Sequence, residues 1–300
     1  MLHPIHLLPR HIREAAKRSV IDRIPGHDLW SLPHITGIGI GEGHVKVTIS
    51  KSHHLHNLIP SELPGGLNVV LEEQPTLRHH FLRDRRSGKS NKHAATTEPI
   101  GPLMGGMPLI DEDTAFGILI DNQGKKLIVG AAHSFAYLRN GTIVYKGRAI
   151  GQFTRSALEC GQTANHLDAS IGMVSDDVAT SASILGLGIP KGFAEPVIGE
   201  HANMQGAYGG RRTGTVTNID YTFIDDYGGE GNYPWHCPVI HQDMFQVSNK
   251  SGIDGDSGAA VWNDAGLLIG LHFDGLDDAG NLGTNCKAAY LTPELGVHLE

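Results

Sequence analysis

Short apolar runs that end in glycine, asparagine or aspartate recur along the whole chain, and they constrain its fold more than any other feature. Runs bounded by these turn residues are typical of strands. The chain carries 39 glycines, which favours closely turned strands over a helical bundle. With 40% hydrophobic residues in a chain of 300, there is enough apolar material for a packed core. The sequence therefore predicts a mainly β protein of the barrel type.

A serine lies between two glycines in the stretch Gly255-Asp256-Ser257-Gly258. Glycine lets the backbone turn tightly and approach a substrate closely, and the N–H groups of Gly255 and Ser257 can converge on a developing negative charge. A turn that begins with Gly-Asp is also ordinary hairpin chemistry. These four residues alone leave both a nucleophile and a structural turn open.

Two stretches upstream supply candidate partners for this serine. An apolar run ends in Gly-Ala-Ala before His133, which puts an imidazole at a strand end with little bulk around it. Asp168 lies inside an otherwise apolar run, and a charge is seldom buried without a partner. A histidine at a strand end can equally cap the strand or turn the chain. An imidazole that becomes charged during a reaction would satisfy Asp168.

Together, His133, Asp168 and Ser257 resemble the catalytic residues of the trypsin-like (chymotrypsin-fold) serine peptidases of bacterial type, over roughly residues 100 to 300. Their order differs from the orders in subtilisin-type enzymes and α/β-hydrolases. The resemblance implies a double six-stranded β-barrel and a serine endopeptidase that needs no cofactor. Ser257 would attack the scissile carbonyl, His133 would transfer its proton, and Asp168 would hold the imidazole. The amides of Gly255 and Ser257 would form the oxyanion hole.

The hairpin after the serine resembles the specificity pocket of glutamyl endopeptidases, where a Gly-Ile-His or Gly-Met-His motif recognises glutamate or glutamine. Gly270-Leu271-His272 is similar to that motif. The residues that the resemblance assigns to substrate binding are Ser251, Gly252, His272, Phe273 and Gly275. Ser251 stands where trypsins carry the acid that selects arginine or lysine, so a Glu, Gln or other polar residue before the cleaved bond is favoured. In a regular strand, Asp274 would share a face with His272 and would neutralise it or favour a basic substrate residue.

The resemblance also divides the chain into two parts. Residues 1–98 would form an N-terminal helix, a small α+β module and a basic linker. Residues 99–300 would form the peptidase domain, with barrels at about 101–185 and about 190–300. The basic run at 77–93 predicts an exposed linker or a processing site. The module would bind a regulatory protein or serve as a packed extension.

Within the N-terminal module, a helix is predicted from residues at helical spacing. Ile12, Ala15, Ala16 and Ile24 recur near that spacing with basic residues between them, and we expect their apolar side to pack against the neighbouring domain. Strands are expected at 35–41, 45–49 and 67–72, with a short helix near 54–61.

Charge, cysteines and histidines narrow the classes of partner and site. A net charge of −8 repels phosphate backbones, so no nucleic-acid partner is expected. Cys160, Cys237 and Cys286 lack the spacings of a disulfide framework or a zinc site, which predicts unpaired thiols in a reducing compartment. The histidine clusters lack a cysteine or carboxylate at a metal-site interval, so no metal is expected. Without a signal-peptide pattern or a membrane-spanning stretch, we expect a cytoplasmic protein that acts on proteins or peptides and has no membrane partner.

Two functions from different classes stay open at this point: a serine endopeptidase, and a catalytically silent or zymogen-like scaffold of the same fold that binds protein partners. The presence of all three residue types in order favours the enzyme. Residues 206–216 also resemble a Gly-Arg-Thr-Thr-Gly strand of bacterial members. Asp256 occupies the position that receives a freed N-terminus in activated relatives, but no Ile-Val-Gly-Gly sequence follows the basic run.

Overall fold

A computed structural model of the chain shows a mainly β protein. It describes residues 4–24, 35–50, 58–73, 77–78, 101–109, 113–136, 138–145, 147–161, 164–227, 237–248, 255–276 and 282–300. The helical segments are short, apart from α1: η1 (Ile5–Leu7), α1 (Arg10–Ile21), α2 (Ala132–Phe135), η5 (Arg139–Gly141), η6 (Ala288–Tyr290) and α3 (Leu291–Leu295). None of the helices in the described ranges is long and apolar enough to cross a membrane.

Strands of the C-terminal part close a ring. Its members are β16 (His201–Gly206), β17 (Gly210–Asp226), β18 (Pro238–Ser248), β19 (Ala260–Asn263), β20 (Leu268–Leu276) and β21 (Leu282–Lys287). They are paired in the order β18-β21-β20-β19-β16-β17, and β17 pairs back onto β18. This ring of six strands lies where the sequence predicts the second barrel.

A second sheet lies where the sequence predicts the first barrel. It has five strands in the order β11-β12-β14-β10-β9. Their bounds are β9 (Gly117–Ile120), β10 (Lys126–Gly130), β11 (Thr142–Tyr145), β12 (Arg148–Ser156) and β14 (Ser170–Val174). Short strands accompany the two sheets: β6 (Leu103–Gly105) pairs with β15 (Thr180–Ile184), β7 (Pro108–Leu109) with β8 (Asp113–Thr114), and β13 (Ala164–Asn165) with β18.

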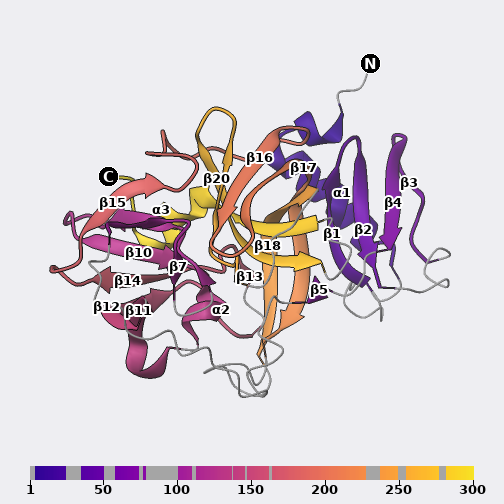
Figure 1. Ribbon diagram of the computed structural model, residues 1–300. Coiled ribbons are helices and arrows are strands. Elements are labelled where there is room, and N and C mark those ends of the chain that lie inside the picture. The colour runs from indigo at the N-terminus through magenta and orange to yellow at the C-terminus, as the bar shows by residue number, and fades with distance from the viewer. Residues whose placement is uncertain are drawn as a thin grey trace.

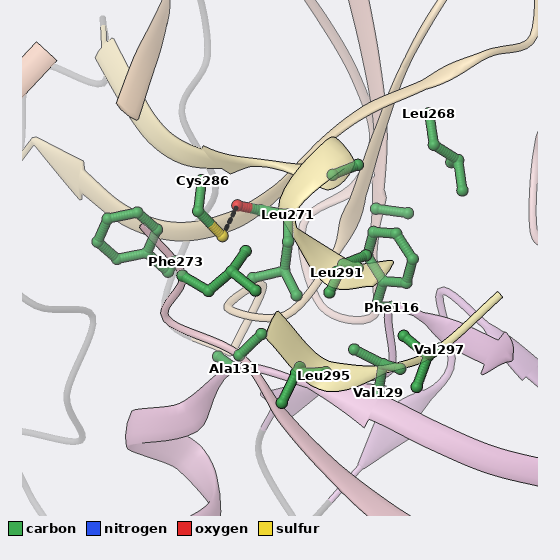
Figure 2. Packing of buried hydrophobic residues seen from close by; sticks show 14 of the residues in the cluster. Phe116, Val129, Ala131, Leu268, Leu271, Phe273, Cys286, Leu291, Leu295 and Val297 are labelled. Carbon is green, nitrogen blue, oxygen red and sulfur yellow. Dashed lines mark hydrogen bonds between the residues drawn. The ribbon is translucent and has the colours of Figure 1, made fainter. Parts of the chain in front are cut away.

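One buried apolar cluster joins the five-stranded sheet, the ring and the C-terminal helix. Phe116 directly precedes β9 and Val129 lies in β10 of the five-stranded sheet, Leu271 comes from the ring, and Leu291 and Val297 come from the C-terminal segment (Figure 2). At about 25 cal/mol per Å² of apolar surface, burial of these side chains is a main source of stability. The cluster also fixes the position of the two strand systems relative to each other.

The N-terminal strands continue the sheet of the ring. They are β1 (Ile35–Gly41), β2 (His44–Ile49), β3 (Glu62–Leu63) and β4 (Leu67–Glu73), close to the predicted ranges. Because β1 pairs antiparallel with β17, these strands extend the ring outward on the side opposite the five-stranded sheet (Figure 1). Ile38 and Val47 share one core cluster with Val216 and Phe245 of the ring.

Two N-terminal predictions fall partly outside the described residues. Of the helix expected near 54–61, residues 51–57 lie outside them, and residues 58–61 form a turn before β3 rather than a helix. Most of the basic run at 77–93 also lies outside them. Its first two residues form β5 (Leu77–Arg78), which pairs with β20.

Helix α1 forms as predicted, and part of its predicted apolar side packs as expected, since Ile24 is buried in a core cluster shared with the ring and Ala16 packs against that cluster. Ile12 of the same predicted side is instead 41% exposed, whereas Lys17 and Val20 are buried. Arg13 and Lys17 point to the ring, where Arg13 binds the carboxylate of Asp220 and Lys17 Nζ donates to its carbonyl at 2.7 Å. The physical reason is that a fully buried carboxylate needs cationic or hydrogen-bonding partners, and periodicity alone cannot show where such a carboxylate will lie.

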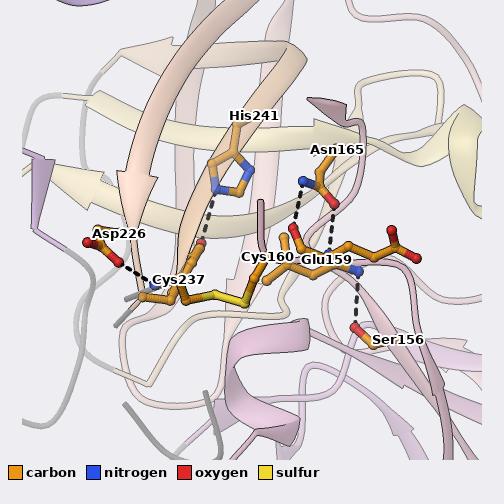
Figure 3. Close-up of a disulfide and its surroundings, with 9 residues drawn as sticks. Ser156, Glu159, Cys160, Asn165, Asp226, Cys237 and His241 are labelled. Carbon is orange, nitrogen blue, oxygen red and sulfur yellow. Dashed lines mark hydrogen bonds between the residues drawn. A yellow bond between two sulfur atoms is a disulfide. The ribbon is translucent and has the colours of Figure 1, made fainter. Parts of the chain in front are cut away.

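The prediction of three unpaired thiols is also wrong, because Cys160 and Cys237 form a disulfide (Figure 3). Their Cα atoms lie 4.9 Å apart although the residues are separated by 77 positions in the sequence. Only the folded pairing of β13 with β18 brings them together, so their spacing carried no signal. Cys286 is free and buried. The expected cytoplasmic location rested in part on unpaired thiols, and that support is thereby removed.

Candidate active site

His133 and Asp168 are brought together by the register of two strands. β10 and β14 are antiparallel with Gly130 opposite Ser170, so the residues just beyond these strand ends lie side by side. His133 is the second residue of α2, which begins there, and its Nδ1 lies 2.8 Å from Asp168 Oδ2. The small residues before His133, predicted to leave room for the imidazole, sit at this junction.

The Asp168 carboxylate is fully buried and has four hydrogen-bond donors. Oδ1 accepts from the amides of Ala132 at 2.7 Å and His133 at 3.0 Å, and Oδ2 accepts from His133 Nδ1 and from the Tyr227 hydroxyl, both at 2.8 Å. Burial alone would raise the pKa of Asp168, but His133, His241 and the Tyr227 hydroxyl together hold that pKa well below its usual range. The group is therefore a carboxylate, and His133 must carry its proton on Nδ1.

Ser257 lies in the turn before β19, packed against the strand end that leads to His133. Gly258 has φ of +91°, and a side chain there would overlap the carbonyl of Thr114 and press on the amide of Ala131, two residues before His133. The Ser257 hydroxyl donates to the Phe273 carbonyl at 3.3 Å. Within the described part of the chain, neither the Gly255 amide nor the Ser257 amide donates a hydrogen bond. Two N–H groups are thus available at this turn for an anionic oxygen.

Asp256 is buried in a cradle formed by the hairpin of β16 and β17. Its Oδ1 accepts from the amides of Gly209 at 2.8 Å and Tyr208 at 3.2 Å, and Arg212 Nε lies 3.8 Å from Oδ2. A side chain at Gly209 would overlap this carboxylate. Asp256 therefore has internal partners at the position that the resemblance assigned to a freed N-terminus.

His272 lies on β20, directly behind the serine turn. Its amide donates to the Ala259 carbonyl at 2.9 Å, and its carbonyl accepts from the Gly258 amide at 2.7 Å. His272 is buried, and its Nδ1 lies 3.2 Å from Asn285 Oδ1. The Asn285 amide nitrogen donates to the Gly283 carbonyl at 3.0 Å, which orients Oδ1 toward the ring and assigns the proton to His272 Nδ1.

The structure places the other residues predicted to bind substrate in several different environments or leaves them outside the described ranges. Ser251 and Gly252 lie outside the described residues. The Phe273 side chain is buried in the core, and its carbonyl faces Ser257. Gly275 pairs with Arg78 of β5.

Asp274 does not follow the regular alternation on which its predicted role depends. The pairing of β20 with β21 shifts register between His272 and Asp274, so two-residue alternation is broken at this point. Asp274 is fully buried. Burial raises the pKa of Tyr221 on β17, and the charge of Asp274 raises it further.

Tyr227 and His241 are polar contacts of the site that sequence reasoning missed. Tyr227 is 59 residues from Asp168, and His241 follows 14 residues after Tyr227. No local pattern joins these positions, since their meeting depends on the pairing of β17 with β18. Within the described residues, no group of three or more His, Cys, Asp or Glu side chains could hold a metal ion.

Comparison with known proteins gives no match from the sequence but several matches from the structure. No protein-family model matches the sequence, and no curated protein matches it. Solved structures do match: a Nocardiopsis protease (NAPase) with a TM-score of 0.52 and 15% identity, over 67% of this chain and 100% of that one. Thermobifida fusca protease A matches with a TM-score of 0.51 and 15% identity, over 66% of this chain and 98% of that one. The protein has the chymotrypsin fold.

A third solved structure of the chymotrypsin fold also matches. It is described as a glutamic acid specific serine protease that uses a histidine triad in substrate binding, and it matches with a TM-score of 0.50 and 18% identity. The match covers 66% of this chain and 100% of that one. In each comparison about a third of this chain lies outside the shared chymotrypsin fold.

Proposed function

We propose that this protein is a serine endopeptidase in which Ser257 is the nucleophile, His133 the general base and Asp168 the group that orients the imidazole. The observation that carries the proposal is the 2.8 Å contact between His133 Nδ1 and a fully buried, ionised Asp168, at a strand end packed against the Ser257 turn. A buried carboxylate that fixes the tautomer of a histidine leaves Nε2 to accept a proton.

The chemistry follows from these groups. The Ser257 hydroxyl turns from the Phe273 carbonyl to His133 Nε2, which takes the proton as Oγ attacks the peptide carbonyl. The amides of Gly255 and Ser257 donate to the resulting oxyanion. His133 then gives the proton to the departing amine, and a water molecule, activated by His133 in the same way, hydrolyses the acyl-enzyme and restores the Ser257 hydroxyl.

Labelling with a fluorophosphonate tests the proposal most directly. We expect the folded protein to be labelled at Ser257 and the urea-unfolded protein to be unlabelled, because only the folded site activates the hydroxyl. Mass spectrometry of the labelled peptide identifies the residue. If a control protease reacts under the same conditions and Ser257 does not, the endopeptidase proposal is wrong and the catalytically silent scaffold takes its place.

His272 is the residue that we propose to set a preference for Glu, Gln or another polar residue before the cleaved bond. Two observations support this proposal. His272 lies directly behind the serine turn, and its contact with Asn285 fixes the proton on Nδ1. With Nδ1 protonated, the neutral ring accepts from an amide such as that of glutamine, and the cation donates to a carboxylate.

We expect His272→Ala to lower the ratio of kcat/KM for Gln or Glu substrates to kcat/KM for a Leu substrate by about tenfold, the value of roughly one charge-assisted hydrogen bond. A peptide library measures this ratio. Because both kcat/KM values come from the same preparation, the ratio does not depend on the fraction of the enzyme that is folded. His201→Ala is the control, because His201 lies on the surface of β16 with 70% of its side chain exposed. An unchanged ratio in His272→Ala removes His272 from the pocket.

The pairing of β5 favours a zymogen-like form as the second candidate. β5 lies antiparallel to β20 opposite Gly275 and Leu276, on the strand that includes the proposed substrate contact Gly275. A peptide that binds by adding a strand to this edge would meet the chain's own segment. Labelling of Ser257 by the small fluorophosphonate, without cleavage of protein substrates, would identify this form.

A further inference from the structure

A chain of two hydrogen bonds continues from Asp168 away from His133. The Tyr227 hydroxyl donates to Asp168 Oδ2 at 2.8 Å and lies 3.2 Å from His241 Nε2. A phenolic hydroxyl has one proton, which here goes to the carboxylate, so His241 must donate to Tyr227. The direction of the chain is therefore from His241 through Tyr227 to Asp168, and all three residues are fully buried.

The fold holds both hydrogen-bond donors, Tyr227 and His241, in place. The Tyr227 amide donates to the Cys237 carbonyl at 3.0 Å, and Cys237 is bonded to Cys160 in the disulfide. His241 pairs with Asn165 of β13, three residues before Asp168. Figure 3 shows His241 in the surroundings of this disulfide. The segment that carries Asp168 and the strands that carry its partners are thus tied together on both sides.

The same two side chains contact the imidazole and the residue whose carbonyl accepts the serine hydroxyl. The Tyr227 ring lies stacked 6.1 Å from the His133 ring. The His241 ring stacks on Phe273 at 5.0 Å, and the Phe273 carbonyl accepts the Ser257 hydroxyl. A change in Tyr227 or His241 therefore acts on groups that contact Asp168, His133 and Phe273.

From this geometry we infer that Tyr227 and His241 are positioning residues, which hold the Asp168 carboxylate so that Oδ2 faces His133 and which share its negative charge. The inference rests on the proposed function. A carboxylate with a free oxygen rotates between donors, whereas Oδ2 here is fixed by a donor on each side. Because Asp168 accepts a hydrogen bond from the Tyr227 hydroxyl, its carboxylate stabilises a cationic His133 less strongly.

Loss of the Tyr227 hydroxyl has a predictable effect on titration. The titratable groups around Asp168 are His133, Tyr227, His241 and the buried thiol of Cys286. In Tyr227→Phe the Asp168 carboxylate stays ionised but loses one hydrogen bond. Its interaction with His133 then becomes stronger, which stabilises the His133 cation. His133 should then titrate at a pH higher by roughly half a unit to one unit.

Tyr227→Phe should also lower kcat by about tenfold with little change in KM, since one hydrogen bond to a charged group is lost and the substrate site is untouched. The acid limb of the pH–rate profile should move to higher pH with His133. Tyr221→Phe is the matched control, because Tyr221 is also fully buried in β17 and its hydroxyl bonds to Thr48 Oγ1 at 2.9 Å, away from Asp168. His241→Leu should move the titration in the same direction, and His241→Gln, which keeps a donor, should restore it.

The deciding measurement is the NMR titration of His133 in a Ser257→Ala background, with the variant His133→Gln used to assign its signal. This readout does not need cleavage, so it judges the positioning chain even if the wild type proves inactive and the proposed function fails. A shift in Tyr227→Phe and His241→Leu that is absent from Tyr221→Phe and His241→Gln supports the inference. Equal titration of His133 in Tyr227→Phe and Tyr221→Phe overturns it.

Discussion

Ser257→Ala should lower kcat/KM for peptide hydrolysis by roughly 10⁶-fold, the size expected when a nucleophile that acts as a unit with its base is removed. The alanine keeps the turn intact, because Gly255 and Gly258 and not the hydroxyl determine its backbone. The serine hydroxyl makes one 3.3 Å hydrogen bond, to the Phe273 carbonyl, so the free energy of unfolding should change by no more than about 1 kcal/mol. Activity and stability would thus be separated in one variant.

Ser248→Ala is the matched control for this experiment. Its hydroxyl also donates to a backbone carbonyl, that of Thr215, at 3.3 Å, and it lies at the end of β18. We expect Ser248→Ala to cleave at the wild-type rate and to unfold at nearly the wild-type urea concentration. Cleavage by purified Ser257→Ala within tenfold of the wild type would show that another residue is the nucleophile. Active-site titration of each preparation excludes contamination by wild-type enzyme.

The mainly β fold and the burial of Asp168 with a polar partner were predictable because their signals are local. Turn residues mark the strand ends, small residues before His133 leave space for a ring, and one acid inside an apolar run indicates a buried charge with a partner. The strand register then brings His133 to Asp168 without any further long-range information.

The features that sequence reasoning missed depend on contacts between distant strands. Tyr227 meets Asp168 only through the pairing of β17 with β18, whose register shifts at several points. The pairing of Cys160 with Cys237 needs β13 to lie beside β18. A bulge in one strand moves every later side chain to another face, so alternation read from the sequence fails beyond it. Asp274, just past such a shift, is the clearest example.

Helix α1 illustrates a different limit, since its pattern is amphipathic but three of its cations, Arg10, Arg13 and Lys17, contact buried groups of the ring. Their partners are Asp220 and Asp243, two fully buried residues with left-handed backbone at φ of 51° and 64°. Lys287 lies between these two carboxylates, 2.7 Å from Asp243 Oδ1 and 3.3 Å from Asp220 Oδ1. The helix is thus attached to the ring by a buried charge cluster as well as by apolar contacts.

The charges in this cluster depend on one another. Burial would lower the pKa of Lys287, but Asp243, Asp220 and Glu195 outweigh it and raise that pKa. Burial raises the pKa of Asp243, and Arg13 with Lys287 holds the pKa of Asp220 below its usual range despite burial. Removal of the lysine would leave two neighbouring buried carboxyl groups with Arg10 and Arg13 as their remaining side-chain cations in the described residues.

We therefore expect Lys287→Met to lower the free energy of unfolding by about 3–5 kcal/mol, the cost of leaving a buried charge without its partner. Urea unfolding followed by fluorescence measures the loss. Lys191→Met is the control, because Lys191 is exposed outside any strand and its replacement should change stability by less than about 0.5 kcal/mol. Asp243→Asn added to Lys287→Met should restore part of the loss, since it removes the charge of the carboxylate that has lost its lysine partner. A loss in Lys287→Met no greater than in Lys191→Met would mean that Arg10 and Arg13 alone neutralise both carboxyl groups, and that the lysine is not needed to hold α1 on the ring.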